Sequence, residues 1–148
     1  KNLEHGFLAA AHHHPDSVGV TIGYNEPLAH LMQAGADAIL IPSRFEPCGL
    51  TQLYAMRYGT LPIVARTGGL ADTVIDANEA ALKAGCATGV QFAPNNGAAL
   101  DVAIARTCAL FSTPDVWKKT MRNAMGQANG WAVSAERYGQ LYSDLVPS

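Results

Sequence analysis

The sequence predicts an α/β fold, an open parallel sheet with helices on both faces. Two apolar runs, at residues 38–41 and 61–65, are short and uninterrupted, as is typical of parallel strands buried on both sides. A glycine-bearing loop follows each run. Predicted strands alternate with predicted helices along the chain, and this alternation favours crossover connections between parallel strands. Residues 97–148 show helical spacing alone. We therefore expect one domain over residues 1–148 that ends in a helical tail.

The composition supports a folded domain, since 49% of the 148 residues are hydrophobic and 15% are charged. The net charge is −2 and the basic residues are not clustered, which argues against nucleic acid or an anionic membrane as partner. No apolar run approaches the roughly 18 residues of a membrane span. The chain begins at Lys1, inside a helical pattern, so we expect an N-terminally truncated part of a longer protein.

Cysteines and histidines give no sign of a metal site. Cys48, Cys86 and Cys108 are odd in number and contain no Cys-x-x-Cys pair, which favours free thiols in a reducing, cytoplasmic location. Three histidines at positions 12–14 precede Pro15 without a second ligand cluster. We interpret them as a solvated helix end and predict no metal.

The first part of the chain predicts a helix, a strand and a second helix. Helical spacing over residues 3–11 ends before Pro15, and the β-branched segment 18–22 predicts a short strand. Asn25 then caps a helix with proline in its first turn, and Gly35 ends it. The predicted buried stripe of this second helix consists of Leu28, Leu31 and Met32.

The remaining elements follow from the same signals. The loop at 42–49 leads into a helix over residues 50–58 that Gly59 closes, a glycine-bearing turn spans 67–69, and residues 90–92 predict another strand. Three helices should then pack as a terminal subdomain, with Ser134 as a candidate cap of the last. Their apolar stripes are Leu100, Ile104, Cys108 and Phe111; Trp117, Met121, Ala124, Met125 and Ala128; and Tyr138, Leu141, Tyr142 and Leu145.

Ligands of open α/β sheets lie beyond the carboxyl ends of the strands. That rule selects residues 23–25, 43–51 and 66–70. The middle segment is the most informative, because the helix after it opens with free N–H groups at Leu50 and Thr51, which attract phosphate. Its sequence also supplies a glycine at position 49, for close approach of the main chain, and a threonine hydroxyl.

Glu46 lies just before this predicted anion site. Its carboxylate would repel a diphosphate unless it faced donors such as sugar hydroxyls, so the pair indicates a sugar nucleotide. The residues alone leave other interpretations open. Glu46 suits a solvated loop, Cys48 a small apolar group, Tyr24 a half-buried core position or a base-stacking one, and residues 67–69 a plain turn.

Two stretches then resemble a known family. Residues 43–59, Ser-Arg-Phe-Glu-Pro-Cys-Gly-Leu-Thr-Gln-Leu-Tyr-Ala-Met-Arg-Tyr-Gly, and residues 62–74, Pro-Ile-Val-Ala-Arg-Thr-Gly-Gly-Leu-Ala-Asp-Thr-Val, closely resemble bacterial glycogen synthases and plant starch synthases. Gly-Tyr-Asn-Glu at 23–26 and the helix at 131–142, with its Ser-Ala-x-x-Tyr-x-x-Leu-Tyr pattern, agree. The resemblance implies a two-domain GT-B glycosyltransferase with paired Rossmann-like halves and the active site in the cleft between them. This chain would be the C-terminal, donor-binding half, an open parallel Rossmann-like sheet that is inactive without its N-terminal domain, on which the final helix packs.

The resemblance also implies an activity: retaining transfer of glucose from ADP-glucose to the non-reducing 4-hydroxyl of an α-1,4-glucan, in glycogen biosynthesis, without a metal or other cofactor. It implies these roles: Glu46 binds the donor glucose hydroxyls and is needed for activity, Cys48, Gly49 and Leu50 line the glucose, Leu50 and Thr51 bind the diphosphate, and Tyr24 stacks on adenine.

Some positions depart from the wider superfamily or stay unassigned. Tyr54 replaces a glutamate that many related transferases use on the ribose; the ADP-glucose branch shares this tyrosine, and ribose recognition is left unassigned. The family's diphosphate-neutralising arginine and lysine precede this chain. We expect Arg44 to brace the loop rather than to contact phosphate, and we assign no role to Arg66. A non-catalytic nucleotide-binding module, or the same transferase with UDP-glucose or a starch granule, stays open.

Overall fold

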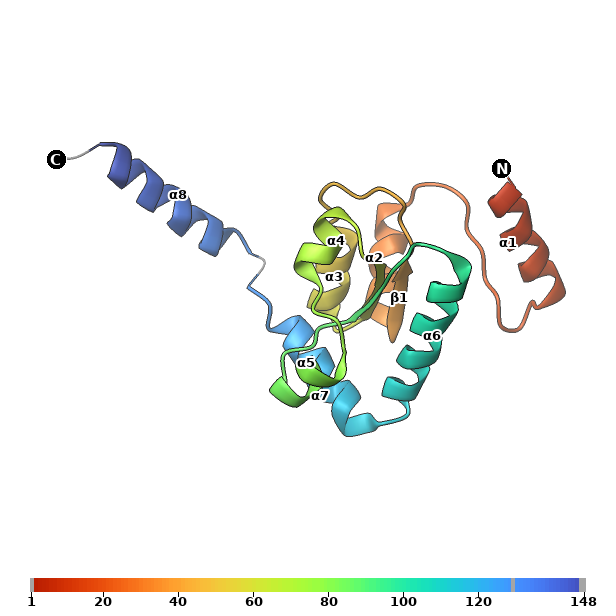
Figure 1. The fold of residues 1–148 in the computed structure, drawn as a ribbon. Helices are drawn as coiled ribbons and strands as arrows, with labels where there is room; N and C mark the ends of the chain where they lie inside the picture. Colours follow the sequence, from red (N-terminus) through yellow and green to blue (C-terminus); the bar gives the residue numbers. More distant parts are fainter. Residues whose placement is uncertain (1, 129, 147–148) are drawn as a thin grey trace.

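The computed structural model describes residues 2–128 and 130–146 and contains a three-stranded parallel sheet. Figure 1 shows the fold. Its strands β1 (Ala38–Ile41), β2 (Leu61–Ala65) and β3 (Val90–Phe92) lie in the order β1-β2-β3. In the register, Ala38 lies opposite Leu61, and Ile63 lies opposite Val90. These strands fall where the apolar runs were, so the predicted parallel sheet is confirmed.

Eight helices are present in the described residues. They are α1 (Asn2–His13), α2 (Glu26–Gly35), α3 (Thr51–Tyr58), α4 (Gly68–Thr73), α5 (Glu79–Ala84), α6 (Gly97–Phe111), α7 (Pro114–Met125) and α8 (Trp131–Leu145). The six longer ones match predicted helices. Helices α4 and α5 have only six residues each, too few for a helical period to show, and the predicted turn at 67–69 is the beginning of α4.

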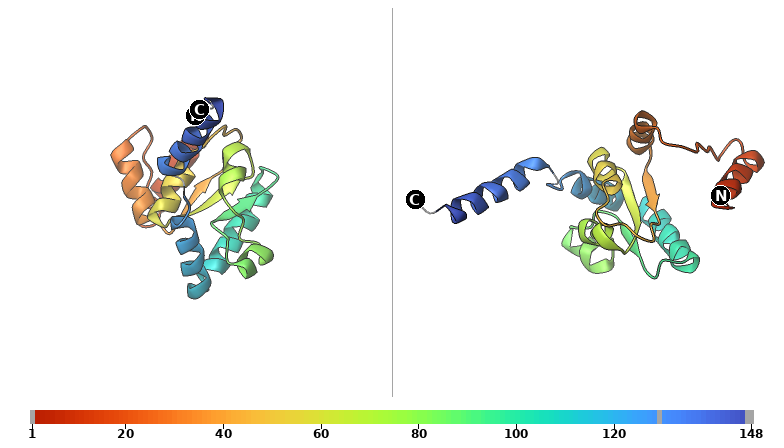
Figure 2. Two further views of the ribbon diagram at one scale, coloured as in Figure 1. Left: turned by 90° about the vertical axis from the view of Figure 1, so that its left-hand side faces the viewer. Right: turned by 90° about the horizontal axis from the view of Figure 1, so that it is seen from above.

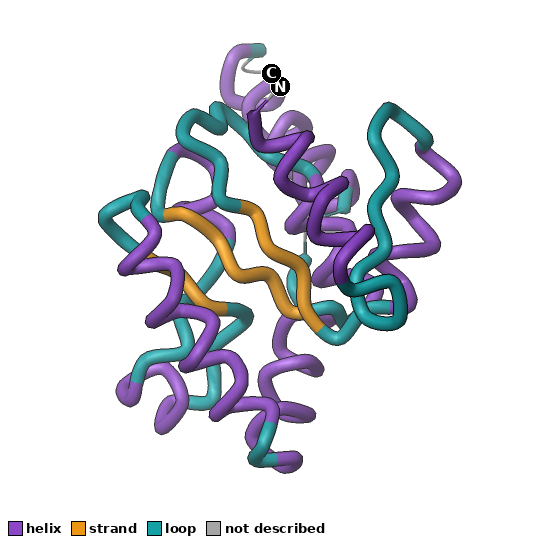
Figure 3. Tube along the Cα trace, turned by 90° about the vertical axis from the view of Figure 1, so that its right-hand side faces the viewer, coloured by secondary structure: helices purple, strands orange, loops and turns teal. Residues whose placement is uncertain are grey.

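Helices cover both faces of the sheet (Figure 3). Successive residues of a strand point to opposite faces, and all five residues of β2 are buried. Val64 packs with Leu70 of α4 on one face, whereas Ile63 packs with Ala103 of α6 on the other. A continuous apolar run is the pattern that such two-sided burial requires.

Helices α6 and α7 belong to the main core. Leu110 of α6 and Trp117 of α7 form one cluster with Met56 of α3 and Leu61 of β2. The expected terminal subdomain of three helices is therefore not formed, because two of the three pack on the sheet and on α3. Helix α8 has no buried residue, and α8 and α1 project from the body in different directions (Figures 1 and 2).

The predicted strand at residues 18–22 is wrong. This segment forms no strand, and the Ile22 side chain is 53% exposed. A strand needs a neighbour for its N–H and C=O groups, and β1 pairs only with β2 among the described residues. β-Branched residues favour an extended backbone, but they do not supply the partner.

Two predicted apolar stripes are also largely wrong, although Leu100 of α6 is half-buried and packs against the core. Leu31 and Met32 of α2 are 70% and 61% exposed, and the buried residue of that helix is Gln33, while Leu28 is half-buried. In α6, Ile104 and Phe111 are 40% and 50% exposed and Cys108 is exposed. The buried residues of α6 are Ala103, Thr107 and Leu110, so the helix is rotated by about one position from the predicted face.

For the last two helices, α7 and α8, the predictions are correct in part. Trp117 and Ala124 are buried as predicted, at 6% and 1% exposure. Helix α8 begins after Gly130, so the predicted cap, Ser134, lies inside the helix. The apolar residues of its predicted stripe are all exposed: Tyr138, Leu141, Tyr142 and Leu145.

Side-chain caps set the start of several helices, and one of them gives a stability test. The Asn96 side chain accepts a hydrogen bond of 2.9 Å from the Ala99 N–H at the start of α6. Asn96→Ala is expected to lower the free energy of unfolding by about 1 kcal/mol, because a helix N–H loses its partner. Urea unfolding measures the change. Asn96→Asp keeps the acceptor and should stay near wild type; an equal loss in both variants would contradict the cap.

Candidate functional site

Residues 42–50 form the loop that follows β1 and delivers the chain to α3. Beside it, at the carboxyl end of β2, lie Thr67 and the first turn of α4. The Gly69 N–H donates to the Glu46 carbonyl at 3.2 Å, so the two segments are in direct contact. The structure thus brings together two of the three predicted ligand-binding segments at this edge of the sheet.

Helix α3 opens without a side-chain cap. Leu50 is its N-cap residue and no side chain bonds to the first turn. By contrast, Asn25 caps α2 and Asn78 caps α5. The N–H groups of the first helical turn have no acceptor within the helix, and no other group among the described residues accepts a hydrogen bond from them. Together with the helix dipole, they form a site suited to an anion.

The Thr51 side chain adds to this end of α3. Thr51 is the first residue of the helix and is exposed, and its hydroxyl has no partner in the described part of the chain. Gly49 lies directly before, with a φ of 70°, a backbone conformation that L side chains rarely adopt. Leu50 is 53% exposed. The predicted diphosphate residues therefore lie open to a ligand at the helix terminus.

Glu46 is half-buried in the same loop. Ser43 Oγ donates to its Oε2 at 3.3 Å, and Oε1 has no partner among the described residues. A carboxylate accepts several hydrogen bonds, so Glu46 keeps acceptor capacity for hydroxyl donors. Two positions further along the chain lies Cys48, whose side chain is exposed, and Gly49 and the start of α3 follow it directly. The arrangement therefore places a partly free carboxylate and an anion site on one short loop.

Main-chain contacts hold the loop closely against α4. A Cβ atom on Gly68 would lie 1.9 Å from the Glu46 carbonyl oxygen, and one on Gly69 would lie 1.9 Å from the Cys48 carbonyl oxygen. Asn95 Nδ2 donates to the Ser43 carbonyl at 2.8 Å at the beginning of the loop. These glycines are required because the two backbones approach too closely for any side chain.

The expected brace is therefore made by other residues. Arg44 was expected to brace the loop, but its guanidinium is exposed and makes no hydrogen bond or ion pair in residues 2–128 and 130–146. Arg66 is exposed, and its backbone N–H donates to Phe92. The actual anchors, Asn95 and Gly69, are distant in sequence from the loop, so no local pattern indicated them.

Helix α2 positions Tyr24. The rings of His30 and Tyr54 lie 5.5 Å apart, and further along the helices Thr60 Oγ1 donates to the Ala36 carbonyl at 2.8 Å. The first contact joins the middle of the two helices and the second joins residues just after their ends. Because both contacts follow the same order along the sequence, α2 and α3 lie side by side and run in the same direction. Tyr24, just before α2, therefore lies at the end where α3 begins.

The Tyr24 side chain is free for a ligand. Its ring is 89% exposed and contacts no other ring in the described residues. Its hydroxyl donates to Glu26 Oε2 at 3.4 Å, a long contact. The half-buried core position that the residues alone had left open is therefore wrong for this tyrosine.

A hollow of about 820 Å³ adjoins the loop. Cys48 and Leu50 line it from the loop, and Trp131, 85% exposed, lines it from the start of α8. Its other walls are made by α3, the end of α7, the segment that follows α7 and the first turn of α8, through Leu53, Tyr54, Arg57, Ala124, Met125, Gln127, Ala128, Gly130 and Ser134. Arg57 and Trp131 were not predicted as site residues, because nothing in their local sequence connects them with the loop.

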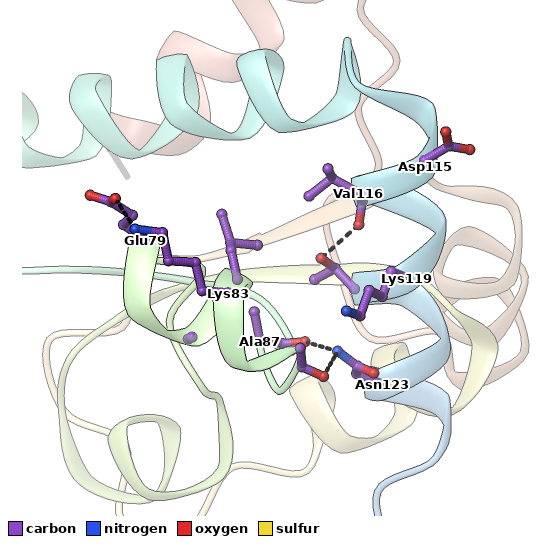
Figure 4. Close-up of a pocket in the computed structure, with 11 residues that line it drawn as sticks. Glu79, Lys83, Ala87, Asp115, Val116, Lys119 and Asn123 are labelled. Atoms are coloured by element: carbon purple, nitrogen blue, oxygen red, sulfur yellow. Dashed lines mark hydrogen bonds and ion pairs between the residues drawn. The ribbon is translucent and has the colours of Figure 1, made fainter.

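A second hollow, of about 420 Å³, lies between α5 and α7 (Figure 4). Its walls include Leu82, Val116 and Lys119, and Asn123 Nδ2 donates to the carbonyls of Gly85 and Ala87 at 2.8 and 3.1 Å. None of the predicted site residues lines it. Of the two hollows, only the one beside α3 is lined by predicted site residues, namely Cys48 and Leu50.

The three cysteines are free thiols, as predicted, and His12 and His13 lie exposed at the end of α1. Across residues 2–128 and 130–146 no cluster of three His, Cys, Asp or Glu side chains could hold a metal ion. Over the same residues, no helix combines the length and apolar character needed to cross a membrane.

Comparison with known sequences gives a consistent result. The model of the family described as "Glycosyl transferases group 1" matches residues 5–124. The glycogen synthase of Roseobacter denitrificans is 62% identical over 146 residues, which are 99% of this chain and 30% of that protein. The glycogen synthase of Rhizobium johnstonii is 59% identical over 144 residues, 97% of this chain and again 30% of its relative.

Solved structures agree with the observed fold. The catalytic domain of starch synthase IV from Arabidopsis thaliana, bound to ADP and acarbose, is 31% identical and superposes with a TM-score of 0.81. The match covers 95% of this chain and 29% of that one. A sucrose-phosphate synthase from Thermosynechococcus elongatus is 26% identical, with a TM-score of 0.66. This chain spans about 30% of the length of its curated relatives.

Proposed function

Because this chain belongs to the glycosyl transferases group 1 family, we propose that it is the donor-binding part of a longer glycogen synthase. The reaction proposed is retaining transfer of glucose from ADP-glucose to the non-reducing 4-hydroxyl of an α-1,4-glucan. One observation carries the proposal: an uncapped helix end and a partly free carboxylate share one loop, in a chain 62% identical to a glycogen synthase.

Stabilisation of the leaving group is the first task of the site. When the bond from glucose to ADP breaks, negative charge grows on the diphosphate, and donors already aimed at that charge lower the barrier. We assign this role to the main-chain N–H groups at Leu50 and Thr51 and to the Thr51 hydroxyl. The site proposed in this chain uses no metal or other cofactor; the remaining charge would be met by the arginine and lysine that the family resemblance places outside it.

Holding the sugar is the second task. Glu46 would accept hydrogen bonds from glucose hydroxyls through its free carboxylate oxygen. Cys48, Gly49 and Leu50 would line the glucose, and Tyr24 would stack on the adenine. A carboxylate beside the sugar also stabilises positive charge that develops on the ring in the transition state. We assign Glu46 to positioning and charge stabilisation, not to nucleophilic attack.

The rest of the proposed enzyme would complete the site. Neither α1 nor α8 buries a residue in this structure, and Leu3 and Leu145 are 78% and 68% exposed. We propose that an N-terminal domain covers such surfaces, that α8 packs on it, and that this chain alone is inactive. A cytoplasmic location, with nucleic acid and membrane excluded as partners, remains part of the same proposal.

Thr51→Val tests the diphosphate site. The variant keeps the shape of the side chain and removes the hydroxyl, so ADP binding is expected to weaken by about 1.5–3 kcal/mol, the usual contribution of a hydrogen bond to a charged group. Isothermal titration of the whole enzyme with ADP measures the change. Thr51→Ser restores the donor and should recover affinity; equal affinities in wild type and Thr51→Val would remove this hydroxyl from the site.

Tyr24→Ala tests the adenine site. Loss of a stacking ring should weaken ADP by about 1–3 kcal/mol. Tyr24→Phe keeps the ring and loses only the long contact with Glu26, so it should bind almost as wild type does. The same titration decides: a Tyr24→Ala variant with unchanged ADP affinity rules out stacking at this position.

A donor competition assay separates the proposal from its alternatives. The whole enzyme is expected to incorporate glucose into glycogen from ADP-glucose in preference to UDP-glucose. Preference for UDP-glucose would keep the transferase and change its donor. If ADP binds and no donor supports transfer, the chain belongs to a non-catalytic nucleotide-binding module.

A further inference from the structure

Gln52 is a fully buried polar residue directly behind the candidate site. It is the second residue of α3, and its side chain is 0% exposed. Its Nε2 donates to the Gly49 carbonyl at 2.8 Å and to Thr73 Oγ1 at 3.0 Å. Both amide hydrogens thus form hydrogen bonds, one with the loop at 42–50 and the other with α4. The side chain therefore connects the loop at Gly49 with Thr73, which lies 21 positions after Gln52 in the sequence.

The connection closes a ring of hydrogen bonds. Thr73 Oγ1 donates to the Gly69 carbonyl at 2.6 Å, and the Gly69 N–H donates to the Glu46 carbonyl at 3.2 Å. Through Gln52, the ring then returns to the loop at Gly49. Both ends of the segment from Glu46 to Gly49 are therefore held against the same short helix.

The shape of the amide also fits the glycine it holds. A Cβ atom on Gly49 would lie 2.7 Å from Gln52 Oε1, so the amide occupies the space that a side chain would need. Oε1 itself is buried without a hydrogen-bond partner in the described residues. An unpaired buried acceptor is unfavourable by about 1–3 kcal/mol, so packing alone does not explain a glutamine at this position. An apolar residue of similar length would fill the space without that penalty.

We propose that Gln52 and Thr73 form a positioning pair that sets the loop geometry for transfer. This inference rests on the proposed function: the pair touches neither donor nor acceptor, and acts by fixing Glu46 and the Gly49 carbonyl relative to the α3 terminus. Displacing catalytic groups by about 1 Å can lower turnover by about 100-fold without loss of the fold. The pair thereby couples two functions of the loop, sugar contact at one end and diphosphate contact at the other.

Kinetics of the whole enzyme test the pair. Gln52→Met keeps side-chain length and removes both donors, and Thr73→Val keeps shape and removes the hydroxyl. Each is expected to lower kcat with ADP-glucose by about 10- to 100-fold, with the KM for glycogen unchanged. The double variant should lose no more than the larger single loss, because both substitutions open the same ring. Thr73→Ser should recover most of the activity lost in Thr73→Val.

Matched controls come from the same fold. Gln33 is also buried, with an unpaired Oε1, and lies on α2; Thr107 donates to the Ala103 carbonyl within α6. Gln33→Met and Thr107→Val alter comparable groups away from the loop and should keep wild-type kcat. If they lower kcat as much as Gln52→Met and Thr73→Val do, the effect is general destabilisation and the positioning role is refuted.

Hydrogen exchange on the ligand-free protein gives a readout independent of the chemistry. In Gln52→Met, amides of the loop at 42–50 should exchange faster than in wild type, with those of β2 unchanged. Unchanged loop exchange together with wild-type kcat overturns the positioning pair and leaves the proposed function intact. If wild type itself transfers no glucose from ADP-glucose, the proposed function fails; faster loop exchange in Gln52→Met would then still establish the ring as the loop's support.

Discussion

Glu46→Ala is expected to lower kcat of the whole enzyme by about 100- to 1000-fold while ADP affinity is retained. The carboxylate has one oxygen held by Ser43 and the other free, as a group that binds hydroxyls requires. Loss of an interaction that matters mainly in the transition state lowers kcat and kcat/KM together. ADP carries no glucose, so its binding does not depend on this contact. Steady-state kinetics with ADP-glucose and titration with ADP measure the two quantities.

A matched control is available in Glu79→Ala. Glu79 forms an exposed ion pair of 2.7 Å with Lys83, and exposed pairs contribute little to stability. That variant should keep wild-type turnover. Glu46→Gln keeps the shape of the side chain, but its uncharged amide accepts weaker hydrogen bonds than a carboxylate does. Its kcat should therefore lie between those of wild type and Glu46→Ala. Near-normal turnover in Glu46→Ala would exclude this residue from the mechanism.

Gly69→Ala should disrupt the site by a different route. The added Cβ would lie 1.9 Å from the Cys48 carbonyl oxygen, so the loop must move by more than 1 Å to relieve the clash. We expect kcat to fall by about 100-fold or more, because Glu46 and the α3 terminus lose their relative placement. Overpacking should also lower the free energy of unfolding by about 1–3 kcal/mol.

Kinetics and thermal unfolding measure both effects of Gly69→Ala. Gly97→Ala is its control, because a Cβ at Gly97 has nothing within 4 Å. It should leave turnover unchanged. A fully active Gly69→Ala enzyme would show that close contact between the loop and α4 is not needed for transfer.

Local signals predicted the elements that surround the site. The apolar runs at 38–41 and 61–65 became β1 and β2, as expected for strands of a parallel sheet covered by helices. All five residues of β2 are buried, whereas in β1 only Ile41 is buried and Leu40 is 42% exposed. Asn25 and Gly59 act as predicted at a helix start and a helix end, with the glycine at a φ of 89°. Because the strand before the candidate site and the helix after it were predicted, the position of the loop and of the helix end between them could be predicted as well.

Partners outside the local sequence explain what was missed. The strand at 18–22 and the stripe containing Leu31 and Met32 needed neighbours that the described residues do not contain. The ring through Gln52 and Thr73, and the brace from Asn95, join residues 21 and 52 positions apart. Hydrophobic period and turn residues carry no information on such pairs, so only the structure identifies them.

The position of ADP in a crystal of the whole enzyme tests the central claim most directly. We predict that its diphosphate oxygens lie about 2.7–3.2 Å from main-chain N–H groups at Leu50 and Thr51, with the adenine on Tyr24 and the glucose side toward Glu46. A diphosphate bound away from the start of α3 would contradict the account.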